Sequence, residues 1–267
     1  MGPIRYIFST VVLAMWVVCG LGLASGQWTS IHCAMLGVAH LGCAIIFSNF
    51  VYVFSYGYGI SMMLVNLLLM AWRPVPAVLL VGGLGLAYGI RLVWFVYTRY
   101  RARGEVANAG VPLPLRLFMW VSCGWLMTFV AMPAWLAGGS SGTITAGILC
   151  GAGLMLAGLV LETVADQQKQ LAKESSPGAF VSSGLYARLR HPNYLGEIIF
   201  QIGLLLVTAV SATGPWAVAA GAAGPLYIVI LMYYAARDQD AQQRRRYGDD
   251  PAFQAHQRQS SSLLPGF

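Results

Sequence analysis

Long apolar stretches separated by short polar segments follow one another along almost the whole chain. Each stretch is near the length of about 20 residues that a helix needs to cross ~30 Å of hydrocarbon. Strand-length alternation of apolar and polar positions does not compete with them, and lipid leaves backbone groups without partners unless they form helices. We expect eight spans, at residues 4–24, 34–55, 59–72, 76–98, 114–137, 143–165, 194–212 and 215–235.

The number of spans depends on two of these stretches. Residues 59–72 are short and could be re-entrant, so seven spans remain an alternative to eight. The stretch after Arg5 could pass for a signal peptide, but its length and the poor cleavage site at Cys19 to Ser25 favour a retained span. The sequence therefore predicts one all-α domain over residues 1–267, a polytopic membrane helix bundle with seven or eight transmembrane helices.

Composition and charge agree with a membrane protein. Hydrophobic residues make up 58% of the chain and charged residues 9%, a balance that a water-soluble domain of this length could not keep in solution. The net charge of +7 comes from basic residues beside span ends, so we expect membrane lipids and not nucleic acid as partners. The five cysteines lack a metal-ligand spacing and are expected to pack in or beside spans.

Basic residues also predict the orientation. They gather in one loop at Arg99, Arg101, Arg103 and Arg116, in another at Lys169, Lys173, Arg188 and Arg190, and in the tail at Arg237 and Arg244 to Arg246. With eight spans these segments share one side with Arg5, and the positive-inside rule makes that side cytosolic. We therefore expect cytosolic N- and C-termini, and an endoplasmic reticulum location in a eukaryotic cell.

Four charged residues share one helix face at the end of the sixth stretch. Glu162, Asp166, Lys169 and Lys173 recur at i, i+4, i+7 and i+11. One interpretation is structural, since Glu-to-Lys pairs and terminal lysines support a helix leaving the membrane. The other is a charged platform for a phosphate-bearing cofactor.

The segment that follows predicts an anion site. Pro192 suits the first turn of a helix, because its missing N–H would have no partner there. A helix that begins near Pro192 would present free amides and a positive dipole end beside Arg188, Arg190 and His191. Phosphate is the natural ligand of such a site, although His191 alone could merely cap the helix.

Asn193, Glu197 and Gln201 then share one face, which takes a carboxylate about one turn into an apolar span. An ionisable residue there is costly unless it has a partner, and this is the strongest argument for a site. The structural alternative is a buried pair with another polar group, of which Arg91, the charge inside the fourth stretch, is one candidate. The polar segments 166–193 and 236–267 flank the last two spans, and we expect the tail to fold as a lid.

The run from Gly184 to Glu197, preceded by Glu162 to Lys169, resembles the steroid 5α-reductase-like membrane family. The likeness extends to Gly89 to Leu92 and to the tail from Arg246 to Pro265, so it covers about residues 85–267. It implies a helix bundle that holds NADPH in a cytosol-facing cavity. It also implies hydride transfer to a carbon–carbon double bond of a sterol, steroid, polyprenoid or enoyl lipid.

Carried over by position, the resemblance implies roles for individual residues. Asp166 and Lys173 would meet the nucleotide, and Asn193 and Glu197 would hold the nicotinamide end. Looser candidates from the same motifs are Arg190, Tyr194 and Arg246, and His191 belongs to the anion site above.

One departure concerns the substrate carbonyl. Steroid reductases polarise it with a Glu from an early helix and a Tyr near the position of Arg91, whereas residues 1–104 contain no acidic residue. Either Arg91 and a tyrosine supply this role, or the substrate is not a 3-keto steroid. Glu197 and Arg91 are the candidate catalytic residues.

Two other functions remain open. The Arg190-His191-Pro192 element and the tail more distantly resemble isoprenylcysteine carboxyl methyltransferases, which would imply S-adenosylmethionine as cofactor. Those enzymes usually carry an adjacent acidic pair in the tail helix, whereas Gln239 separates Asp238 from Asp240. A scaffold or transporter is the third class, but the chain shows neither clear repeats nor broken helices.

Overall fold

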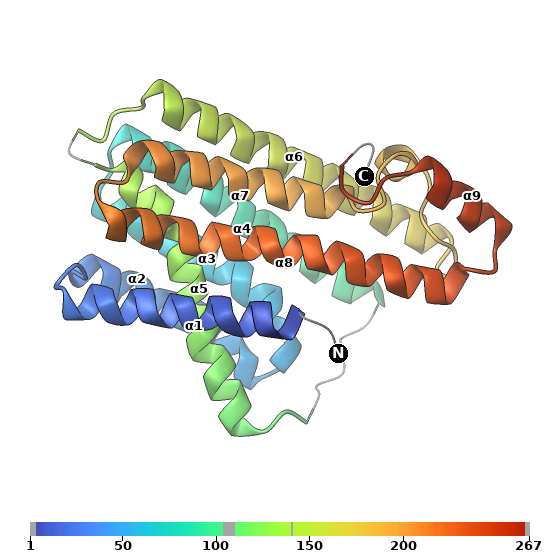
Figure 1. Cartoon of the computed structure of the whole chain (residues 1–267), viewed down its shortest axis with the longest axis horizontal. Helices are drawn as coiled ribbons and strands as arrows, with labels where there is room; N and C mark the ends of the chain where they lie inside the picture. The colour runs from blue at the N-terminus through green and yellow to red at the C-terminus, as the bar shows by residue number, and fades with distance from the viewer. Residues whose placement is uncertain (1–3, 104–109, 140, 265–267) are drawn as a thin grey trace. The chain divides into compact units, whose positions relative to one another are not determined.

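The computed structural model describes residues 4–103, 110–139 and 141–264, and this part of the chain is almost entirely helical. The α-helices are α1 (Ile4–Ala24), α2 (Ser30–Cys43), α3 (Tyr56–Trp72), α4 (Pro76–Arg103), α5 (Leu113–Ala137), α6 (Ala146–Ser175), α7 (Pro192–Ser211), α8 (Pro215–Tyr247) and α9 (Pro251–Gln259) (Figure 1). The 3₁₀ helices are η1 (Ala44–Phe47), η2 (Phe50–Phe54) and η3 (Gly184–Ala187). The all-α prediction is confirmed. The side chain of Arg5 and the residue Pro265, which entered the predicted topology and tail, lie outside the described residues.

Length and hydropathy make this an integral multi-pass membrane protein. Six helical segments are long and apolar enough to cross a bilayer: Ser30–Phe47, Pro76–Arg101, Leu113–Ala137, Ala146–Ser175, Pro192–Ser211 and Pro215–Tyr247. Two shorter apolar helices, Val12–Ala24 and Tyr56–Trp72, match the first and third predicted stretches. The predicted polytopic bundle is therefore confirmed.

The predicted span at 34–55 is wrong as a single helix. Its α-helix begins earlier, at Ser30, and ends at Cys43, after which η1 and η2 lead into α3. Asn49 breaks the run, because it is extended (φ −144°, ψ 122°) and its side chain accepts a hydrogen bond from the Val51 amide at 3.1 Å. Asn at this position caps the next turn, which the surrounding hydropathy hides.

Two helices continue far beyond the predicted spans, and for α6 the shared helix face of Glu162, Asp166, Lys169 and Lys173 had predicted this. Helix α6 runs on to Ser175 and α8 to Tyr247, well beyond their apolar parts. Asp250 then caps α9, accepting from the Ala252 amide at 2.8 Å, and Pro251 occupies the first turn. The predicted lid thus contains a short helix that the sequence analysis did not predict.

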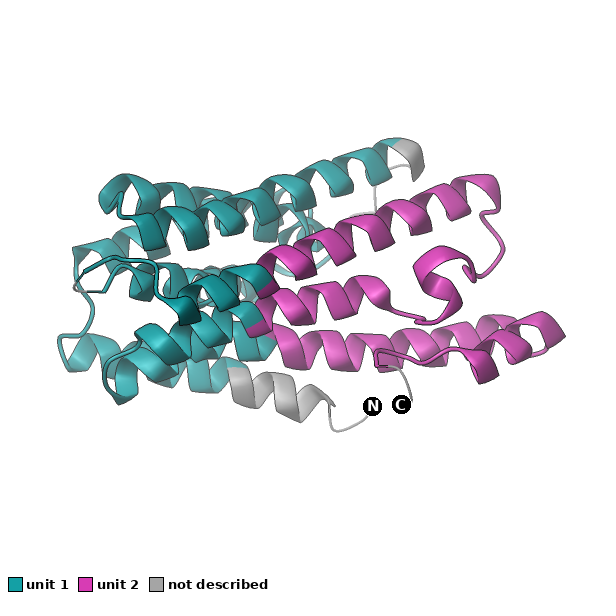
Figure 2. Ribbon diagram, turned by 90° about the horizontal axis from the view of Figure 1, so that it is seen from above, with its two compact units in different colours: residues 1–153, 203–227 teal, residues 154–202, 228–267 magenta. Residues whose placement is uncertain are grey.

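Contacts divide the chain into two compact units, coloured separately in Figure 2. Unit 1 comprises residues 1–153 and 203–227, and unit 2 comprises residues 154–202 and 228–267. In unit 1, α3 packs on α2, α4 and α5.

In unit 2, two glycines bring α6 and α7 together. A Cβ on Gly158 would lie 2.5 Å from the Gly196 carbonyl oxygen, and one on Gly196 would lie 2.6 Å from the Glu162 nitrogen. Small residues allow such close backbone approach between helices in membranes. The contact places the polar end of α6 directly against the first turns of α7.

Candidate functional site

Four carboxylates are buried among the described residues of unit 2, and one of them is Asp240 of α8. Glu162 and Asp166 lie on α6 and Glu197 lies on α7, with exposed fractions of 8%, 6% and 3%. The fully buried amide of Gln201 donates to Glu197 Oε1 at 2.7 Å, so the predicted shared face of these two residues is confirmed. Ionisable groups in so apolar a setting are costly to bury, which marks the region as a candidate site.

Helix η3 is anchored to α6. Gly184 begins η3 with a φ of 61°, and a Cβ there would lie 2.4 Å from Gln168 Oε1. The same Gln168 oxygen accepts from the Leu185 amide at 2.9 Å. Glycine is needed here for both its backbone conformation and its lack of a side chain.

This anchoring places Tyr186 inside unit 2, where only 2% of it is exposed. Its hydroxyl donates to Asn193 Oδ1 at 3.5 Å. Burial raises the pKa of Tyr186, and the charges of Asp166, Tyr194 and Glu162 raise it further. The phenol therefore keeps its proton and serves as a hydrogen-bond donor. Tyr186 lies within the motif that the sequence shows, but no role was predicted for it.

Asp240 of α8 joins the start of α7 to the tail. Arg190 donates to both of its oxygens, at 2.9 and 3.0 Å, His191 Nε2 lies 2.9 Å from Oδ1, and Ser262 Oγ donates to Oδ2 at 2.8 Å. Arg190 also donates to the Ser260 carbonyl oxygen. A bidentate guanidinium–carboxylate pair is a strong and directional contact.

We call Asp240 with Arg190, His191 and Ser262 the Asp240 knot. The sequence predicted a phosphate beside Arg190 and His191, whereas in the structure their bonds go to the protein's own carboxylate. Backbone pairing strengthens the link, since the Arg190 and His191 amides donate to the carbonyls of Ser261 and Ser262. The knot holds the tail against the segment before α7.

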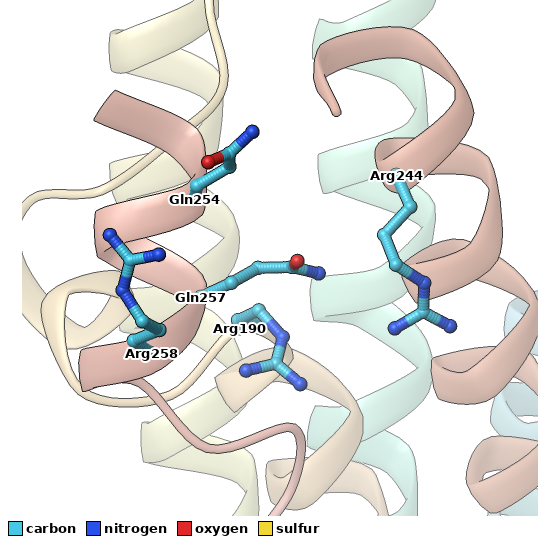
Figure 3. Close-up of a pocket in the computed structure, with 5 residues that line it drawn as sticks. All are labelled: Arg190, Arg244, Gln254, Gln257 and Arg258. Carbon is cyan, nitrogen blue, oxygen red and sulfur yellow. The ribbon is translucent and has the colours of Figure 1, made fainter. Parts of the chain in front are cut away.

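A pocket of about 420 Å³ opens beside the knot (Figure 3). Its lining residues are Arg190, Arg244 of α8, and Gln254, Gln257 and Arg258 of α9. These five residues supply three guanidinium groups and two amides, and no carboxylate. Guanidinium forks match the geometry of phosphate oxygens, so the chemistry of the lining suits a polyanion.

Of the predicted cofactor residues, Arg190 alone is among the five that line this pocket. Lys173 donates to the Ala179 carbonyl and lies over the Tyr247 ring, with its Nζ 6.0 Å from the centroid. Arg246 lies over the same ring at 5.2 Å. Tyr194 stacks on His191 with centroids 5.4 Å apart.

Sequence reasoning missed Arg244, Arg258 and the two glutamines. The available signal was the run of three arginines in the tail. This run entered the predicted topology, and Arg246 was the one chosen as a candidate cofactor residue. Arg244 differs from its neighbours in the face of α8 that it occupies, and this face lines the pocket together with residues of α9. The role of Arg244 could therefore not be predicted before α9 was known.

Arg91 belongs to unit 1, where its guanidinium lies over the Phe95 ring at 5.4 Å from the centroid. Glu197 belongs to unit 2. Their predicted pairing and their shared catalytic role stay predictions.

The fold places the chain among integral multi-pass membrane helix bundles, here with ionisable side chains buried in one unit. The model of one protein family, described as Protein of unknown function (DUF1295), matches residues 32–260. Because this match includes most of the chain, the protein belongs to that family. None of the curated proteins and none of the solved structures compared with the chain matches it.

Proposed function

We propose that the protein is an NAD(P)H-dependent membrane reductase that saturates a carbon–carbon double bond in a lipid-like substrate of the sterol, steroid, polyprenoid or enoyl class. The observation that carries the proposal is the pocket with three arginines in its lining. NADPH presents several phosphate groups, which need cations and N–H donors. A relation of the family to steroid 5α-reductase-like membrane proteins also supports it.

Arg244 and Arg258 would hold the phosphates of the cofactor, while Arg190 lines the same pocket and stays bonded to Asp240. NADPH, when bound, supplies a hydride. The chain's own residues would orient its uncharged end, with the Asn193 amide and the Glu197 carboxylate as partners for a carboxamide. Tyr186 would offer a protonated hydroxyl in the same buried cluster, where the exclusion of water strengthens each hydrogen bond.

Methyl transfer from S-adenosylmethionine is the competing function. That cofactor carries a sulfonium cation and no phosphate, so three arginines would oppose part of its charge. The acidic residues of the tail do not act as a pair either, because Asp240 is engaged in the knot while Asp238 is exposed. These observations favour the nicotinamide cofactor.

The basic segments beside the pocket also support an orientation. We place the pocket and both termini on the cytosolic side, where NADPH is present, because the positive-inside rule assigns arginine-rich segments to that side. In a eukaryotic cell the endoplasmic reticulum is the membrane we propose. Reactivity of an engineered tail cysteine toward a membrane-impermeant maleimide, in intact and in permeabilised cells, tests this orientation.

The decisive experiment is thermal unfolding of the detergent-purified chain with NADPH, NADH or S-adenosylmethionine. A ligand that binds only the folded state stabilises it by mass action, by about 2.7 kcal/mol at a concentration of 100 Kd. We expect NADPH to stabilise the protein and S-adenosylmethionine not to. Stabilisation by S-adenosylmethionine alone would reverse the assignment.

Two substitutions locate the binding. Arg244→Gln and Arg258→Gln should each raise the Kd for NADPH roughly tenfold or more, since each removes a charged donor to phosphate. Arg245→Gln is the matched control, because Arg245 is exposed and next to Arg244 but is not one of the five lining residues. Equal effects of all three substitutions would point to general electrostatics and not to this pocket.

A further inference from the structure

Three neighbouring aromatic residues of unit 1 carry buried ring nitrogens. Trp28 lies in the connection between α1 and α2, His32 in the first turn of α2, and Trp216 in the first turn of α8. The His32 ring lies 5.5 Å from the Trp28 ring and 5.7 Å from the Trp216 ring, measured between centroids. The Nε1 atoms of both tryptophans and Nε2 of His32 are buried, and none has a hydrogen-bond partner among the described residues.

The tautomer of His32 follows from its neighbour. The Thr29 amide lies 3.1 Å from His32 Nδ1, and an amide N–H can only donate. Nδ1 must therefore accept, which leaves the ring neutral with its proton on Nε2. All three buried nitrogens, two of indole and one of imidazole, are thus N–H donors.

Gly22 of α1 shows that the indole nitrogens converge. A Cβ at this position would lie 2.2 Å from Trp28 Nε1 and 2.6 Å from Trp216 Nε1. Only glycine leaves room for both nitrogens to turn inward at this point. A Cβ added to Gly20, two residues earlier on the same helix, would have no neighbour within 4 Å.

Aromatic rings surround this group of donors. Trp135 lies 4.4 Å from His32, and Trp125 and Phe129 lie 5.7 and 6.5 Å from Trp28, between centroids. Tryptophans at helix ends commonly form a membrane-interface belt, with their N–H groups directed at water or headgroups. That explanation fails here, since His32 is fully buried and both indole nitrogens are covered.

We propose that Trp28, His32 and Trp216 form a binding site for the carbonyl oxygen of an uncharged lipid-like molecule. Buried polar groups are nearly always hydrogen-bonded, and a set made only of donors matches a group that only accepts. A water molecule would have to donate two hydrogens as well as accept. An anion would be buried among apolar rings, at a high cost in solvation. The inference does not rest on the proposed reductase activity.

The test uses the full chain, labelled with ¹⁵N at its eight indole nitrogens and purified in dodecyl maltoside, a detergent without a carbonyl group. The probes are 2-nonadecanone and nonadecane, which share chain length and differ in the carbonyl. We expect the ketone to move the indole N–H resonances of Trp28 and Trp216 downfield and to leave the other six nearly in place. The hydrocarbon should move neither. Because the ketone has no carbon–carbon double bond, the result is independent of any reductase activity.

Phenylalanine substitutions assign the two resonances and measure their contribution. Trp28→Phe and Trp216→Phe each keep an aromatic ring and remove one N–H, so each should weaken ketone binding roughly threefold to tenfold. Trp94→Phe is the control, because Trp94 is 66% exposed on α4. Gly22→Ala should abolish the ketone response, whereas Gly20→Ala should preserve it.

Three outcomes would overturn the proposal. The first is an equal response to ketone and hydrocarbon. The second is no response of Trp28 and Trp216 at saturating ketone. The third is magnetisation transfer from these indole protons to water that persists with ketone present, which would identify a buried water molecule as the acceptor.

Discussion

Two kinds of hydrogen bond satisfy buried polar side chains, and Asp240 in unit 2 and two side chains in unit 1 illustrate them. In unit 2, Asp240 is bonded to Arg190 and His191, which lie 50 and 49 positions away in the sequence. In unit 1, Asn66 and Thr128 each donate to the carbonyl four residues earlier on their own helix, at 2.8 and 2.9 Å. The bonds of Asp240 connect separate segments, whereas those of Asn66 and Thr128 stay within one helix. In unit 1, Ser61 also makes a bond of the first kind, because its hydroxyl donates to the Ala39 carbonyl at 2.9 Å.

The difference matters for function. A hydrogen bond within one helix leaves the arrangement of helices to apolar packing. The charged bonds of the Asp240 knot instead determine where the tail and the arginines of the pocket lie relative to α7. The Trp28, His32 and Trp216 group shows neither kind of bond, because its three buried nitrogens have no hydrogen-bond partner among the described residues.

Asp240→Ala should lower the stability of the protein more than any of the other proposed substitutions. It leaves the Arg190 guanidinium, whose side chain is 12% exposed, without its carboxylate. Removing one partner of a buried ion pair typically costs about 3–5 kcal/mol. Equilibrium unfolding in detergent measures the loss, and Asp238→Ala on the exposed face of α8 is the control. Similar stability of both variants would show that the knot does not hold the tail.

Gly196→Ala should have the next largest effect on stability. The new methyl group would lie 2.6 Å from the Glu162 backbone nitrogen, so α6 and α7 must separate. Overpacking of this kind costs about 1–3 kcal/mol. Gly153→Ala on α6 is the control, because nothing lies within 4 Å of its added Cβ. The melting temperature in detergent distinguishes the two, and an unchanged value for Gly196→Ala would contradict the close approach.

Local rules predicted much of this arrangement from the sequence. Pro192 correctly predicted the start of α7, and helical spacing correctly placed Glu197 beside Gln201. Both predictions use only residues within one helix, where geometry fixes neighbours at i+4. Apolar length likewise predicted most of the spans.

What the sequence did not predict depends on distant partners or on small polar signals. The Asp240 knot requires knowledge that the tail returns to the start of α7, which no periodicity contains. The pocket requires α9, whose start depends on the cap at Asp250. The break at Asn49 was missed because a single capping residue barely changes the mean hydropathy of an apolar stretch.

Glu197→Gln removes the charge of this buried side chain in unit 2 and keeps its shape. Glutamine can still accept from Gln201, so we expect the stability to change by no more than about 1 kcal/mol. Under the proposed function, the Kd for NADPH should rise roughly tenfold with the loss of a charged acceptor. Binding of 2′,5′-ADP, which lacks nicotinamide, should stay unchanged.

The fragment distinguishes the two ends of the proposed site, because Arg244→Gln should weaken both NADPH and 2′,5′-ADP. Glu174→Gln, at the exposed end of α6, is the control for the loss of an acidic charge. If Glu197→Gln bound NADPH as tightly as the unmodified protein, Glu197 would have only a structural role.

Thr128→Val tests the other half of the comparison and should have the smallest effect. Valine keeps the shape of threonine, and the lost hydroxyl was bonded only to the Gly124 carbonyl of its own helix. Polar contacts between groups inside membranes average about 0.6 kcal/mol, and this one also leaves its acceptor bonded within α5. We therefore expect a change below about 1 kcal/mol in the same unfolding experiment, although Thr128 is fully buried. A loss as large as that of Asp240→Ala would mean that Thr128 connects helices after all, and the contrast between local and long-range bonding would fail.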